Sequence, residues 1–132
     1  MHDYLPPLRA VFFSVFDDLQ GLKLCFEVPE GSCSLPLDDG ASLFDLAAEY
    51  ILPKEGICGH LITICLKRHK ILGYPVFLSG DSYARGMFVF NVSFVFDRDS
   101  ELAAYEPLVR KTGRTLRALE VHFFCLLSLW IV

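Results

Sequence analysis

The chain has 132 residues, of which 53% are hydrophobic, and a formal net charge of −4. This length suits one domain with a single core. The net negative charge argues against a nucleic-acid-binding domain, which would be basic overall, and the apolar composition predicts an exposed patch that a partner covers.

The cysteines and the chain ends indicate a cytoplasmic protein without a membrane span. The five cysteines are an odd set with no close Cys-x-x-Cys pair, which suits reduced thiols. The first seven residues are acidic and proline-broken, where an export signal needs positive charge and then an apolar run. Residues 122–132 are strongly apolar but far fewer than the ~20 residues that cross a bilayer.

Two strand patterns open the chain. Residues 8–16 are apolar and β-prone, 17–21 carry turn chemistry, and 22–28 alternate, so a β-hairpin is predicted. Alternation in the second arm predicts one shared face for Leu22, Leu24, Phe26 and Val28. Residues 29–40 lack any periodicity and predict a loop.

A short helix is predicted next. Ser42 is a candidate N-cap, and Asp45 three residues later completes a weak capping box. Pro53 is expected to end the helix. The apolar stripe at helical spacing consists of Leu43, Phe44, Leu46, Ala47, Tyr50 and Ile51.

Three further strands are predicted. Residues 61–66 and 71–78 are apolar runs joined by a charged turn. Pro75 removes one ladder donor, so the strand that contains it should be interrupted there or lie at an edge. Residues 83–96 form the longest pattern, and we expect a central strand, because one face is apolar and the other is mixed. The apolar face carries Phe88, Phe90, Val92, Phe94 and Phe96.

A second helix is predicted from about Tyr105, with Pro107 in its first turn. Its expected inner face consists of Leu108, Val109, Thr112, Leu116 and Leu119. Its expected outer face carries Arg110, Lys111, Arg114 and Arg117. Such a stripe is usually a solvated face, and an acidic partner is the alternative. The amphipathic pattern is lost from Val121 onward.

The predicted fold is therefore α+β, with a five-stranded, mainly antiparallel sheet in the order β-β-α-β-β-β-α(-α) and helices on its faces. Residues 8–120 form this domain, and residues 121–132 form an apolar tail.

No intrinsic catalytic site or cofactor site is predicted. The four histidines lie in positions typical of structural or solvated residues, and Cys58-Gly59-His60 offers only two close metal ligands. No phosphate-binding glycine motif is present. Arg85 stands where a loop enters the long strand, a place from which a guanidinium can reach a partner's active site.

Ten short segments keep a common order and spacing. They are VFFSVF (11–16), GLKL (21–24), VPE (28–30), FD (44–45), YILPK (50–54), LIT (61–63), KILGYPV (70–76), YARG (83–86), FNVSFVFD (90–97) and YEPLVRK (105–111). Together they resemble the N-terminal region of the nitrogen permease regulator 2 family, over about residues 8–120.

The resemblance implies a longin domain in a regulatory subunit. Such a subunit pairs with a sister subunit similar to nitrogen permease regulator 3, and a third, larger subunit completes the complex. The complex activates GTP hydrolysis by Rag-family GTPases and restrains TOR signalling when amino acids are scarce, at the vacuolar or lysosomal surface. The resemblance makes Arg85 the expected arginine finger, which acts in trans.

Residues 121–132 differ from the polar helical continuation typical of the family, and we expect a truncated or misread C-terminus. Residues 31–40 form a longer loop than the family usually has. Two alternatives remain open. One is a non-catalytic longin scaffold for heterodimerisation or trafficking complexes, and the other is a defective fragment that does not fold alone.

Overall fold

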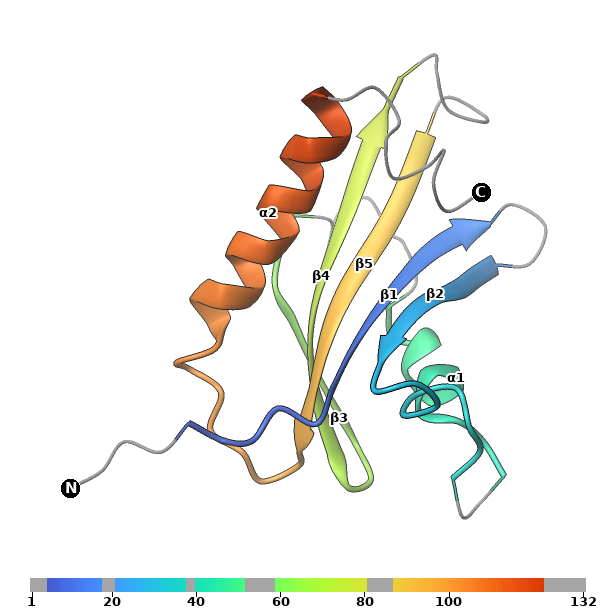
Figure 1. Ribbon diagram of the computed structural model, residues 1–132, viewed down its shortest axis with the longest axis vertical. Helices are drawn as coiled ribbons and strands as arrows, with labels where there is room; N and C mark the ends of the chain where they lie inside the picture. Colours follow the sequence, from blue (N-terminus) through green and yellow to red (C-terminus); the bar gives the residue numbers. More distant parts are fainter. Residues whose placement is uncertain (1–4, 18–20, 38–39, 52–58, 81–86, 123–132) are drawn as a thin grey trace.

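The computed structural model describes residues 5–17, 21–37, 40–51, 59–80 and 87–122. Its strands and helices follow one another in the predicted order (Figure 1). They are β1 (Ala10–Asp17), β2 (Gly21–Val28), α1 (Leu43–Ala48), β3 (Ile62–Leu66), β4 (His69–Ser79), β5 (Met87–Asp97) and α2 (Glu106–His122). The chain is an α+β fold, as predicted. Residues 123–132 of the predicted tail lie outside the described part.

All five strands pair antiparallel, in the order β2-β1-β5-β4-β3. The hairpins β1–β2 and β3–β4 are joined through β5, which pairs with β1 on one side and with β4 on the other. Helix α2 lies along β4 and β5, while α1 packs against the opposite face (Figure 1). The predictions of a central fifth strand and of helices on the faces of the sheet are confirmed.

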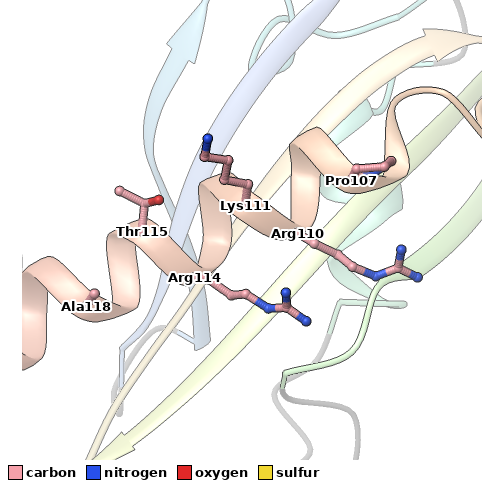
Figure 2. Close-up of a pocket in the computed structure, with 6 residues that line it drawn as sticks. All are labelled: Pro107, Arg110, Lys111, Arg114, Thr115 and Ala118. Carbon is pink, nitrogen blue, oxygen red and sulfur yellow. The ribbon is translucent and has the colours of Figure 1, made fainter.

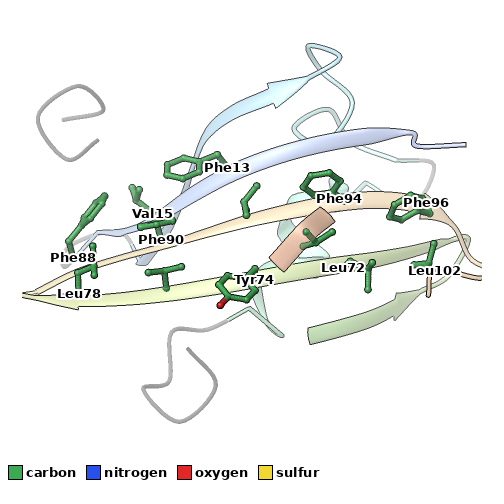
Figure 3. Packing of buried hydrophobic residues seen from close by; sticks show 13 residues of the cluster. Phe13, Val15, Leu72, Tyr74, Leu78, Phe88, Phe90, Phe94, Phe96 and Leu102 are labelled. Atoms are coloured by element: carbon green, nitrogen blue, oxygen red, sulfur yellow. The ribbon is translucent and has the colours of Figure 1, made fainter. Parts of the chain in front are cut away.

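Strand β5 separates two core layers. Its aromatic face lies in the layer beneath α2, beside Leu72 and Tyr74 of β4 (Figure 3). On its other face Val95 joins the layer beneath α1. Burying one large apolar side chain is worth roughly 1.5–3 kcal/mol, so this strand is a main source of stability. The predicted face is confirmed, with all its members at most 8% exposed: Phe88, Phe90, Val92, Phe94 and Phe96.

Strand β2 does not keep one face from end to end. Phe13 of β1 pairs with Phe26, but the next residue of β1, Ser14, pairs with Leu24, so Cys25 is an extra residue in the ladder. This β-bulge reverses the alternation. Leu24 packs toward α1, whereas Phe26 turns to the other face, with its ring centroid 6.5 Å from that of Phe13. The predicted common face of this strand is therefore wrong beyond Leu24.

Strand β4 runs through Pro75 without interruption. Strand β3 pairs with it only as far as Gly73, whereas pairing with β5 continues to Ser79. The carbonyl of Pro75 accepts a hydrogen bond from the Gly59 N–H at 2.7 Å. Because the nitrogen and oxygen of one residue point to the same side of a strand, the missing donor faces away from β5. Strand β4 is thus neither interrupted at Pro75 nor an edge strand, so the prediction for this strand is wrong. Pro75 is accommodated because it lies beyond the last pair with β3, where no ladder donor is needed.

Helix α1 begins as predicted. The Ser42 hydroxyl accepts a hydrogen bond from the Asp45 N–H at 3.0 Å, and the Asp45 carboxylate accepts one from the Ser42 N–H at 3.4 Å. This capping box satisfies two backbone donors that the first turn leaves without partners. The helix ends at Ala48, and Pro53 lies outside the described residues. Tyr50, predicted in the apolar stripe, is 58% exposed.

Helix α2 is rotated relative to its predicted orientation. Leu108 and Leu119, expected inside, are 48% and 37% exposed. The cause is Gly113, where an added Cβ would lie 2.2 Å from the Tyr74 ring, so the helix backbone rests directly on β4. The spacing of apolar residues could not predict this contact, because glycine has no side chain. The buried line of the helix consists of Val109, Gly113, Leu116 and Glu120, with Leu116 only partly buried.

A buried polar row crosses the α1 face of the sheet. Ser14 and Asn91 are paired across β1 and β5, and the Asn91 Nδ2 donates a hydrogen bond to the Ser93 hydroxyl at 2.6 Å. None of the three is more than 2% exposed. Gly73 on β4 gives them room, because a Cβ there would lie 3.2 Å from the side-chain oxygens of Asn91 and Ser93.

Candidate interaction site

The predicted arginine finger, Arg85, belongs to residues 81–86, which lie outside the described part of the chain. The two strands that this segment joins are described. The last residue pair between them is Ser79 with Met87, and Met87 is two residues after Arg85 in the sequence. Phe90 anchors this end of the sheet, with its ring centroid 5.4 Å from that of Phe13. The segment is thus attached to a well-packed end of the sheet.

The outer face of α2 carries the cations that the sequence predicts there. Arg110 forms an ion pair with Glu106, one turn earlier, at 3.5 Å. Lys111 and Arg114 are exposed. Figure 2 shows Arg110 and Arg114 extending on one side of the helix, with Lys111 on the other. The predicted basic face is confirmed.

The same face of α2 is hollowed. An open groove of about 560 Å³ is lined by these cations and their neighbours on the helix, which Figure 2 shows as sticks. Its lining combines the long side chains of the cations with the short ones of Pro107, Thr115 and Ala118. The groove residues are Pro107, Arg110, Lys111, Arg114, Thr115 and Ala118. The sequence pattern predicts the cations but not the groove. The groove could have been predicted from Pro107, Thr115 and Ala118, which lie three or four residues from the cations and so share their side of the helix.

The edge strand β2 exposes apolar side chains. Phe26 is 44% exposed and Val28 is 68% exposed, and both belong to the outermost strand on this side of the sheet. An edge strand presents unpaired backbone groups to another chain. Apolar exposure at such an edge is suited to a protein partner, in agreement with the patch that the composition predicts.

The loop after β2 is fixed by one carboxylate. Glu27 Oε1 accepts hydrogen bonds from the N–H groups of Cys33 and Ser34, at 2.8 and 2.9 Å. Burial raises the pKa of the Glu27 carboxyl, but hydrogen bonds from the Ser34 hydroxyl and from these backbone groups outweigh it, so the net pKa is lowered. The carboxylate therefore stays ionised and holds the loop against the sheet.

The remaining sequence candidates are not brought together. His60 and His69 lie at opposite ends of the β3–β4 hairpin, and Cys58 lies outside the described residues. In the described ranges, no three His, Cys, Asp or Glu side chains are grouped as metal ligands would be. Burial raises the pKa of the Cys25 and Cys33 thiols, which disfavours their thiolates.

Neither described helix has both the length and the apolar composition needed to cross a bilayer.

Comparison with known proteins now identifies the family. The family model for nitrogen permease regulator 2 matches residues 6–129. The nitrogen permease regulator 2 homolog of Schizosaccharomyces pombe is 35% identical over 92% of the chain, and nitrogen permease regulator 2 of Saccharomyces cerevisiae is 35% identical over 86%. GATOR complex protein NPRL2 of Drosophila melanogaster is 34% identical over 92%. The chain spans 31%, 18% and 28% of the lengths of these relatives, respectively. It belongs to the nitrogen permease regulator 2 family.

Proposed function

We propose that this chain is the longin-type pairing domain of a regulatory subunit in a GTPase-activating complex. It pairs with a sister subunit similar to nitrogen permease regulator 3, and a third, larger subunit completes the assembly. The complex acts on a Rag-family GTPase at the vacuolar or lysosomal surface and restrains TOR signalling when amino acids are scarce. Family membership carries the proposal, and one relative is itself named as a GATOR complex protein.

In this proposal, Arg85 is the residue that acts on the GTPase. A finger must be held by a rigid support, because its guanidinium has to meet charge that develops on the transferring phosphoryl group. The paired ends of β4 and β5, with Phe88 and Phe90 buried beneath them, provide such a support next to Arg85 in the sequence.

Single-turnover GTP hydrolysis by a Rag-type GTPase tests this role, with the chain assembled with both other subunits. Arg85→Ala should leave assembly intact and lower the stimulated rate by on the order of a hundredfold or more, since arginine fingers supply about 10³–10⁵ in rate. Arg85→Lys should restore little, because lysine lacks the planar fork. Arg68→Ala is the matched control, since it removes an exposed arginine from the β3–β4 turn. Full stimulation of GTP hydrolysis by the assembly that carries Arg85→Ala would refute the catalytic role.

A non-catalytic scaffold is the second candidate, and the exposed apolar edge of β2 favours it. A scaffold needs only a pairing surface, and Phe26 and Val28 offer one. Val28→Asp should weaken co-purification with the sister subunit, whereas Lys23→Asp, an exposed position on the same strand, should not. If the Arg85→Ala chain still pairs with the sister subunit and the assembly still stimulates GTP hydrolysis fully, the chain is a non-catalytic scaffold.

A further inference from the structure

The charges of this chain are unevenly distributed. Its formal net charge is −4, yet four of its twelve Lys and Arg residues lie within eight consecutive positions of α2. Among the acidic residues of this helix, Glu106 is paired with Arg110, and Glu120 is fully buried on the inner side. The outer face of α2 is therefore a positive strip on an acidic chain.

The strip has the geometry of a recognition groove. Residues three, four and seven positions apart share one side of a helix, so Arg110, Arg114 and Arg117 form one row, with Lys111 and Thr115 in the next. The groove is lined by residues of both rows and is open to solvent. The strip covers eight of the 17 residues of the helix and is about 12 Å long at 1.5 Å per residue, so a short acidic segment can lie along it.

The residue types identify the class of ligand. Three of the four cations are arginines, whose fork binds carboxylates through two parallel hydrogen bonds and which are enriched at protein interfaces, where lysine is depleted. A membrane or a nucleic acid would meet the field of the whole acidic chain. A short acidic segment meets mainly the charges within about a Debye length of 8–10 Å, and among the outward residues of α2 these are four cations against one carboxylate, that of Glu106.

We propose that the outer face of α2 docks an acidic segment of a partner protein, with carboxylates from that segment paired to Arg110, Arg114 and Lys111 across the groove. Each pair lies at the surface and contributes modestly, so binding depends on several pairs at once and weakens as salt screens them. This docking does not depend on Arg85, because it occurs on α2 rather than at the β4–β5 end of the sheet.

Fluorescence anisotropy of a labelled peptide of alternating glutamate and glycine residues tests the proposal on the full chain. The double variant Lys111→Glu/Arg114→Glu should weaken peptide binding on the order of tenfold or more, because attraction is replaced by repulsion. The control Lys23→Glu/Arg68→Glu makes the same change of net charge at exposed positions elsewhere and should bind like the unsubstituted chain. Arg110→Lys/Arg114→Lys keeps the charge but loses the fork, and should bind several-fold more weakly.

A thermal melt of each variant shows whether it folds. If Lys111→Glu/Arg114→Glu does not fold, the neutral variant Lys111→Gln/Arg114→Gln takes its place. Vesicles of phosphatidylcholine, with and without phosphatidylserine, are the competing probe. Peptide binding that falls with salt and with the α2 substitutions supports the proposal. Equal loss in the control pair, binding to phosphatidylserine vesicles but not to the peptide, or binding to neither probe would each overturn it.

Discussion

Gly113→Ala measures how closely α2 rests on the sheet. In an open helix this change stabilises by about 0.5–1 kcal/mol, because alanine is the better helix former. Here the new Cβ would lie 2.2, 2.7 and 2.8 Å from three atoms of the Tyr74 ring, where ordinary contacts begin near 3.4 Å. The ring is 5% exposed and cannot swing aside, so the helix must lift by on the order of an ångström.

Overpacking of this kind costs about 1–3 kcal/mol, which exceeds the propensity gain. We expect a net loss of about 1–2 kcal/mol and a melting temperature lower by roughly 4–7 °C for a domain of this size. Circular dichroism during heating provides the measurement. Thr115→Ala, an exposed position two residues further along, is the control and should cause no loss. In a Tyr74→Leu background, Gly113→Ala should become neutral or stabilising, because the ring is gone. A variant Gly113→Ala that melts as high as the unsubstituted chain would refute this reasoning.

Three further predictions concern the α1 side of the sheet and the cysteines. Ser42→Ala removes the N-cap acceptor of a helix of 6 residues and should destabilise the chain by about 1 kcal/mol, as read by urea denaturation; Thr at this position should recover most of the loss. Glu27→Gln should reduce the pH dependence of the melting temperature below pH 4.5, the ordinary pKa of the group. The lowered pKa of Glu27 adds stability that is present above that pH and is lost as the pH falls through the folded-state value; an unchanged slope would contradict the loop-holding role. Iodoacetamide followed by peptide mass mapping should modify the exposed Cys65 well before the fully buried Cys33, and equal rates would show that the loop over Cys33 opens freely.

The order of strands and helices could be predicted from the sequence, because the spacing of apolar residues within each element matches the side that the element buries. The alternation of β5 predicts its aromatic face, since both faces of a central strand are fixed by its neighbours. The capping box of Ser42 and Asp45 is equally local. In such elements the residues that determine the conformation are adjacent in the sequence, so the sequence alone is sufficient.

Two features could not be predicted because they depend on a second element. The bulge at Cys25 exists only in the register between β1 and β2, and alternation within β2 alone gives no sign of it. The rotation of α2 depends on the fit of Gly113 against Tyr74. The groove of the candidate site has the same origin, because the rotation decides which small side chains face outward between the arginines.

The polar row of Ser14, Asn91 and Ser93 has a consequence for the order in which the sheet assembles. Strands β4 and β5 are close in the sequence, whereas β1 joins β5 across most of the chain, so closure of that long loop is the slower event. A shift of one residue when β1 docks would place its apolar side chains against the wrong layer, and a shift of two would set a hydrophobic residue opposite Asn91. The polar row thus marks the correct alignment for the last strand pair to form, at the cost of hydrogen bonds that Ser14 and the Asn91 oxygen leave unmade within the described structure.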